Sequence, residues 1–238
     1  MAGAGAFLGR ICLPAAEEFG LLLRDKVSHW RGNNAAKITL MAEQLLESQG
    51  GIAGRQAHPR IVGRTLESGS WEDDDQVQSM WAGLLASGCS KDGKDQSNLV
   101  FIHLLEQMTS AQAKILKFCC ERAHKYKSAQ GYVHSDVLQL TLDEVLLQLS
   151  STNIHDADVQ LDHMRELGVF LGGFQTYESF ARIEPTSLGL SLYTRSTGFT
   201  GSPIDFFQIT EVRPTPPSFD EAVATPDVTD QQASSSAL

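Results

Sequence analysis

Apolar residues in the first part of the chain recur at steps of three and four positions, the spacing that puts side chains on one face of a helix. The first such stripe ends at Trp30, and Asn33 or Asn34 can cap the helix that follows. Glycines near residue 50 end this second helix, and Pro59 suits the first turn of the next one. The pattern predicts helices over 13–30, 34–46, 59–66, 77–85 and 99–108.

The second half of the chain carries stronger signals for helix starts. Thr109–Gln112 and Thr141–Glu144 each fit a capping box, in which a Thr side chain and a Gln or Glu three residues later satisfy each other's backbone N–H groups. A further stretch is helical in its spacing and stops at Gly168. We expect helices over 111–126, 141–149 and 156–167.

The periodicity changes after residue 168. Val169–Leu171 and Phe174–Ile183 are typical of two strands, joined by a turn at Gly172–Gly173. Seven of the eleven phenylalanines follow residue 169, and aromatic side chains favour the half-buried surface of a sheet. Pro185 then begins a last helix through Tyr193. Three helices followed by a hairpin is the order of a winged helix.

The end of the chain has a different composition. Five of the eight prolines follow residue 202, and the last 26 residues carry four acids against Arg213 alone. Such a segment has too few apolar residues to form a core. The predicted fold is therefore mainly α, with a helical bundle over 1–108, a winged-helix-like α+β module over 109–200 and a flexible, disordered, acidic Pro/Ser-rich tail over 201–238.

Composition excludes several classes of protein. A hydrophobic fraction of 42% is enough for a core, and no run of 18 apolar residues predicts a membrane span. The net charge of −10 repels phosphate and disfavours binding of nucleic acid. Four cysteines without a CxxC pair, and a start without a basic signal-peptide region, favour a cytoplasmic protein. Residues 1–30 fit at most a weak contact with a membrane surface.

No motif for catalysis or phosphate binding is present, neither GxSxG, HExxH, a kinase signature nor a P-loop. Two short segments gather side chains of the types that bind metals or act as nucleophiles, but acids at a helix start and half-buried thiols are ordinary. They are His155, Asp156, Asp158, Asp162 and His163, and Cys119, Cys120 and His124. We predict no catalytic or metal-binding residue and no cofactor, while an enzyme whose site combines distant residues stays open.

A winged helix that reads DNA contacts phosphates with basic residues. Its third helix here would be 156–167, which has four acids and one Arg. Basic residues instead gather on the preceding helix over 111–126, where they are candidates for contact with nucleic acid or with a protein partner. They are Lys114, Lys117, Arg122 and Lys125. A structural or protein-binding use of the module is favoured, with a DNA-binding regulator as the alternative.

Two stretches of the chain resemble the Abi-alpha family, the abortive infection alpha proteins of bacteria. They are Trp30–Ile38 (WRGNNAAKI) and Asp74–Ser87 (DDQVQSMWAGLLAS), and the stretch Ile183–Tyr193 (IEPTSLGLSLY) is similar to the end of that family. The resemblance extends over about residues 5–197. It implies antiviral defence, in which an infected bacterium arrests or dies before the phage spreads, and it implies no catalytic residues.

Four residues of these stretches have two interpretations. Trp30 and Trp81 fit core positions, and burial of each contributes on the order of 2–3 kcal/mol. Asn34 fits a helix cap, and Lys37 fits an ion pair with an acid. Alternatively, this helical half forms a surface for self-association or for a phage component. We therefore expect a non-enzymatic interaction protein of phage defence with a protein partner or as a homo-oligomer. Its rivals are the DNA-binding regulator and a toxic effector.

Overall fold

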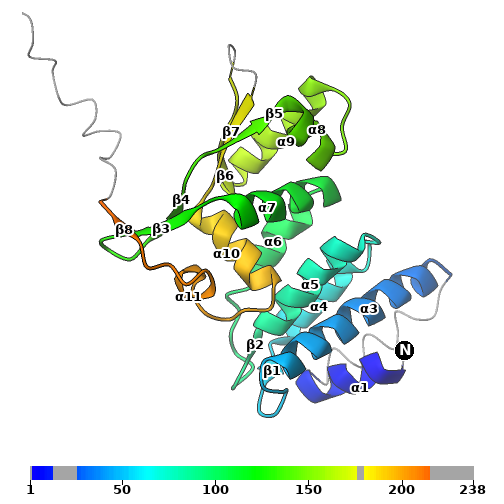
Figure 1. Cartoon of the computed structure of the whole chain (residues 1–238). Coiled ribbons are helices and arrows are strands. Elements are labelled where there is room, and N and C mark those ends of the chain that lie inside the picture. The colour runs from blue at the N-terminus through cyan, green and yellow to red at the C-terminus, as the bar shows by residue number, and fades with distance from the viewer. Residues whose placement is uncertain (1, 13–25, 176–179, 215–238) are drawn as a thin grey trace, which may run out of the picture.

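The computed structural model describes residues 2–12, 26–175 and 180–214, which form mostly helices together with small sheets (Figure 1). The helices are α1 (Ala2–Ile11), α3 (Lys26–Ser48), α4 (Pro59–Gly69), α5 (Asp75–Ser87), α6 (Leu99–Gln107), α7 (Ser110–Arg122), α8 (Leu142–Gln148), α9 (Ile154–Glu166), α10 (Ser187–Ser196) and α11 (Pro203–Phe206). The strands are β1 (Gln56–Ala57), β2 (Cys89–Ser90), β3 (Lys125–Ser128), β4 (Val133–Ser135), β5 (Leu138–Thr141), β6 (Phe170–Phe174), β7 (Phe180–Pro185) and β8 (Val212–Arg213).

The helices are stacked from α1 at one end of the molecule, through α3, α5 and α7, to α8 and α9 at the other (Figure 1). Helix α5 lies in the middle and is buried along most of its length, including Trp81, Leu84 and Leu85. The buried apolar residues of both halves form one continuous cluster. The division of the chain at residue 108 stays a prediction. No helix in the described part of the chain has the length and apolar character that crossing a bilayer needs.

Helix α3 differs from the expected pair of helices. It continues from residue 26 through Asn33 and Asn34, so the predicted break with an asparagine cap is wrong. The reason is tertiary, because Asn34 Nδ2 donates to the backbone oxygen of Ser70 (3.1 Å) instead of closing a helix end. The remainder of the expected first helix, residues 13–25, lies outside the described residues.

Both predicted capping boxes are confirmed, and a cap residue close in sequence, Asp74, also fixes the start of α5. Asp74 Oδ1 accepts the backbone N–H groups of Gln76 (3.0 Å) and Val77 (3.2 Å) at the start of α5. Both capping boxes are formed, at the starts of α7 and α8. Pro59 is the first residue of α4, and Gly88 follows the last residue of α5.

The expected order of three helices and a hairpin is present in α7, α8, α9 and the strands β6 and β7. The sequence missed β5, which pairs antiparallel with β7 in a sheet of order β5-β7-β6. The predicted turn at Gly172–Gly173 is wrong, because both residues pair with β7 inside β6. Gly172 has φ +81°, and a Cβ there would lie 2.0 Å from the backbone oxygen of Arg182, so the close approach requires glycine.

Two other boundaries also differ from expectation. Helix α7 ends at Arg122, and the residues from Lys125 form β3 instead of its last turn. Residues 201–214, assigned to the tail, contain α11 and β8, and β8 pairs parallel with β3. The rest of the predicted tail, 215–238, lies outside the described residues.

Candidate functional site

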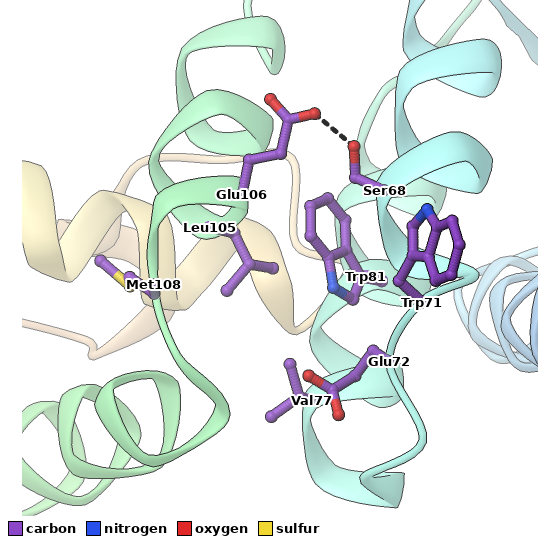
Figure 2. A pocket seen from close by; sticks show the side chains of 8 residues that line it. All are labelled: Ser68, Trp71, Glu72, Val77, Trp81, Leu105, Glu106 and Met108. Carbon is purple, nitrogen blue, oxygen red and sulfur yellow. Dashed lines mark hydrogen bonds between the residues drawn. The ribbon is translucent and has the colours of Figure 1, made fainter.

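A hollow of about 320 Å³ opens between α4, α5 and α6 (Figure 2). Apolar side chains from α5 and from the end of α6 face it, two tryptophans stand on one side, and two glutamates lie at its edges. We call it the tryptophan groove. Its lining residues are Ser68, Trp71, Glu72, Val77, Trp81, Leu105, Glu106 and Met108.

The tryptophans of this region have different exposures. Trp81 is 4% exposed, which confirms the core position expected for it. Trp30 is 42% exposed, so a core position is wrong for that residue. Its ring contacts Trp71, with 6.4 Å between the centroids and a tilt of 57°, and Trp71 itself is 57% exposed. The groove therefore continues into an exposed aromatic surface made by Trp71 and Trp30.

Arg31 holds this surface in place. Its guanidinium carbon lies 4.2 Å from the centre of the Trp71 ring, a cation–π distance. Its Nε donates to Ser70 Oγ (3.0 Å) and its Nη2 to the backbone oxygen of Glu67 (3.1 Å). Sequence reasoning missed both Arg31 and Trp71. The only signal was a tryptophan placed among polar residues between two helices, where no apolar period explains it.

The charge at the groove is negative. Glu72 and Glu106 line it, and no basic residue does. Glu72 is fixed, because its Oε1 accepts the backbone N–H groups of Asp73 (3.0 Å) and Asp74 (2.8 Å) and its Oε2 accepts Ser110 Oγ (2.8 Å). Glu106 accepts the hydroxyl of Ser68 (Figure 2). The groove thus combines rigid aromatic rings with fixed carboxylates.

Most of the predicted basic residues form ion pairs with acidic side chains. Lys114 pairs with Asp74, Lys117 with Glu121 (2.9 Å) and Arg122 with Glu144 (3.0 Å). Burial acts to raise the pKa of Asp74, but the hydrogen bond and charge of Lys114, with backbone N–H groups, hold it below its usual value.

Lys125 lies apart from this set, on β3. Its Nζ donates to the backbone oxygen of Glu121 (3.2 Å) and lies 4.4 Å from the centre of the Phe207 ring. The structure therefore does not gather the four predicted cations into an unpaired basic patch.

Lys37 forms the ion pair expected for it, with Asp75. Both side chains are largely exposed, so the pair contributes less than about 1 kcal/mol to stability. The pair joins α3 to the start of α5 beside the tryptophan groove.

A family model described as abortive infection alpha matches residues 33–189, about two thirds of the chain. The chain belongs to the abortive infection alpha family. Membership indicates a role in abortive infection, the bacterial defence against phage. Comparisons with curated proteins and with solved structures gave no match. The matched segment contains Trp71, Trp81 and the whole lining of the groove, whereas Trp30 lies just before it.

In this abortive infection alpha protein, Cys119 and Cys120 do not form a catalytic pair with His124. Cys119 and Cys120 are fully buried, and burial raises the pKa of Cys119 to about 12 and that of Cys120 well above its ordinary value. His124 instead lies between Asp136 (Nδ1 to Oδ2, 3.4 Å) and Glu211 (Nε2 to Oε2, 3.2 Å). Protonated, buried thiols are poor nucleophiles.

The candidate metal ligands of α9 have other partners. Asp162 pairs with Arg165 (2.8 Å), and His163 Nδ1 lies within hydrogen-bond distance of the Gln112 side chain. Within residues 2–12, 26–175 and 180–214, no three His, Cys, Asp or Glu side chains come together as metal ligands. Of these side chains, His163 contacts α7 through Gln112, whereas Asp162 forms its ion pair within α9.

Proposed function

We propose that this protein defends a bacterium against phage by abortive infection, and that it acts by binding a partner protein at the tryptophan groove rather than by catalysis. Family membership supports the defence role. The observation that carries the binding role is the exposed pair Trp30 and Trp71, which widens the groove into an aromatic surface held by Arg31. Large exposed aromatic groups are the side chains that dominate binding energy at protein interfaces.

The charge of the groove determines which partner fits. Glu72 and Glu106 line it, Asp73 is exposed beside it, and the whole chain carries −10. A partner segment with an apolar anchor and flanking Lys or Arg residues complements this surface. Burial of one large apolar anchor contributes on the order of 2–3 kcal/mol, enough to make the anchor the main determinant of affinity.

The test is the double variant Trp30→Ala, Trp71→Ala, expressed in a phage-sensitive bacterium. We expect the wild-type chain to lower plaque counts across a phage panel and infected cells to stop growing. The double variant restores plaque counts to those of the empty vector, because the aromatic surface is gone. Tyr132→Ala is the matched control, since Tyr132 is 68% exposed on the turn between β3 and β4 and should keep protection.

Folding of each variant is checked by circular dichroism and thermal unfolding. Unchanged plaque counts with the wild-type chain on a broad panel contradict the defence role. Full protection by the folded double variant contradicts the groove as the interface. If the wild-type chain forms a dimer and the double variant does not, the partner at the groove is a second copy of this chain and not a foreign protein.

The segment from α7 to β7 is proposed to be a winged-helix-like module with a structural or protein-binding role. The order of its helices and the sheet β5-β7-β6 support this assignment. Two observations oppose its use as a DNA reader. Helix α9 carries four acids, and its Arg165 is paired with Asp162; the basic residues of α7 are in ion pairs. The cytoplasm is the proposed place of action, supported by four free, buried cysteines.

A gel-shift assay at low salt separates this proposal from the DNA-binding alternative. We expect no salt-dependent shift with duplex DNA, because the cations of α7 already face carboxylates. The control variant changes Lys114, Lys117 and Lys125 to Glu. A shift by the wild-type chain that weakens with salt and is lost in this variant would establish the regulator instead.

A further inference from the structure

A second hollow, of about 300 Å³, lies at the opposite end of α5 from the tryptophan groove. The last turn of α5, the ribbon of β1 and β2, and the end of α10 surround it, and these elements lie close together in Figure 1. We call it the arginine pocket. Its lining residues are Arg55, Ser87, Cys89, Ser90, Lys91, Asp95, Arg195 and Thr200.

The arginine pocket differs from the rest of this acidic chain in its charge. Three cationic side chains line it, Arg55, Lys91 and Arg195, against the single carboxylate of Asp95. No carboxylate of the described residues lies within ion-pair distance of any of the three, although eight other Lys and Arg residues pair with acids elsewhere in the fold. Those eight are Arg10, Lys37, Arg64, Lys114, Lys117, Arg122, Arg165 and Arg213.

Asp95 does not neutralise the pocket. The backbone and hydroxyl of Ser97 donate to it, and these hydrogen bonds, followed by the charge of Arg195, hold its pKa below the ordinary value. Its carboxylate is thus ionised at neutral pH, and the lining keeps two positive charges in excess. The ends of α5 and α10 add about −0.5 charge each, so the pocket remains positive by about one charge.

The wall of the pocket is rigid. Ser87 Oγ donates to the backbone oxygen of Arg195 (2.9 Å) and accepts from Asn98 Nδ2 (2.8 Å), which fixes the end of α10 against the end of α5. Asn98 Nδ2 also donates to the backbone oxygen of Leu84 (2.8 Å). The backbone that carries the Arg195 side chain is therefore fixed. A fixed backbone is the condition for a pre-organised binding site.

Three cationic heads need at least three acceptor oxygens. A carboxylate offers two, whereas a phosphate group offers three or more and carries about −1.5 to −2 charge at neutral pH. The hydroxyl of Thr200 adds a neutral polar group at the same hollow, whereas the hydroxyl of Ser90 donates to Asp92 Oδ1 (3.0 Å). We propose that the arginine pocket is a binding site for the phosphate group of a small molecule, held by Arg55, Lys91 and Arg195.

The chemistry of the pocket is binding, not catalysis. Cys89 is the one thiol that lines it, and burial raises its pKa to about 12, so it stays protonated. The site therefore supplies recognition of an anion. It lies where β1, β2, α5 and α10 meet, so a bound phosphate joins the helical half to α10, independently of the partner proposed for the tryptophan groove.

Isothermal titration calorimetry of the full chain at constant ionic strength tests this site, with inorganic phosphate and adenosine monophosphate as probes. We expect saturable binding, and tighter binding of whichever probe resembles the natural source. Arg55→Ala and Arg195→Gln each weaken binding about ten- to a hundredfold, because each removes a charge-assisted contact. Arg64→Ala is the matched control, since Arg64 lies on α4, pairs with Glu67 (3.7 Å) and does not line the pocket.

Absence of saturable binding for both probes overturns the proposal, and so does binding that survives both pocket variants unchanged. Arg195 lies in the last turn of α10, so circular dichroism verifies that its variant folds. Arg55 lies outside any helix, and Arg55→Ala decides the question if the other variant unfolds. Equal weakening by Arg64→Ala indicates a general effect of charge and also overturns the site.

Discussion

At Gly83, helix α5 packs closely against the end of α10 and the residues that follow it. A Cβ built there would lie 1.8 Å from the backbone oxygen of Ser196 and 2.9 Å from the backbone nitrogen of Gly198. Both contacts are backbone atoms at the end of α10, which cannot rotate away. Because Gly83 has no side chain, α5 can pack directly on the end of α10. The same packing forms the wall of the arginine pocket.

We expect Gly83→Ala to lower the free energy of unfolding by about 2 kcal/mol or more, measured by urea denaturation. Alanine favours a helix over glycine by about 1 kcal/mol, but separating α5 from α10 costs more than that gain. Gly63→Ala on α4 is the control, because no atom lies within 4 Å of its added Cβ. It should stabilise by up to about 1 kcal/mol. Equal effects of the two variants would contradict the close approach at Gly83.

Individual helices were predictable where their start depends on neighbours in sequence. The α7 start is fixed by Thr109 and Gln112, and the α8 start by Thr141 and Glu144, each pair three residues apart. Such caps use hydrogen bonds inside one turn, so the sequence alone contains the information.

Elements that depend on distant partners were missed. Strand β5 is short and exists because β7, some forty residues later, pairs with it. Likewise the end of α7 and the start of β3 are set by pairing with β4 and β8. The sequence predicts a turn at Gly172, whereas in the structure its positive φ allows β6 to approach β7 closely. Local pattern cannot supply these contacts.

The candidate site also contains some residues that the local pattern predicts and others that depend on distant contacts. Trp81 follows a helical period, so its buried position was predicted. Trp71 lies between α4 and α5, and its place beside Trp30 depends on how α3 packs against them. The arginine pocket joins residues from 55 to 200, and no local spacing relates Arg55 to Arg195.

On the scale of the whole molecule, the described part of the chain ends by returning to its middle. Strand β8 pairs with β3, about 85 residues earlier, and Lys127 N donates to the backbone oxygen of Glu211 (3.0 Å). Arg213 then pairs with Asp136 (2.6 Å), and its guanidinium carbon lies 4.2 Å from the centre of the Tyr126 ring. Side-chain contacts at the surface thus hold a very short strand.

This closure should weaken in acid. The hydrogen bond from Arg213, then its charge and that of His124, hold the pKa of Asp136 below its usual value. The stabilisation is therefore complete above about pH 4, the range of the unfolded carboxyl, and is lost as pH falls through the folded pKa. We expect Asp136→Asn to lower the free energy of unfolding at pH 7 by less than about 1 kcal/mol, since the pair is exposed. In urea unfolding, the difference from wild type should shrink as the pH falls below about 4. Glu166→Gln, a control on an exposed acid of α9, should show no such convergence, and a pH-independent difference for Asp136→Asn would contradict the ion pair.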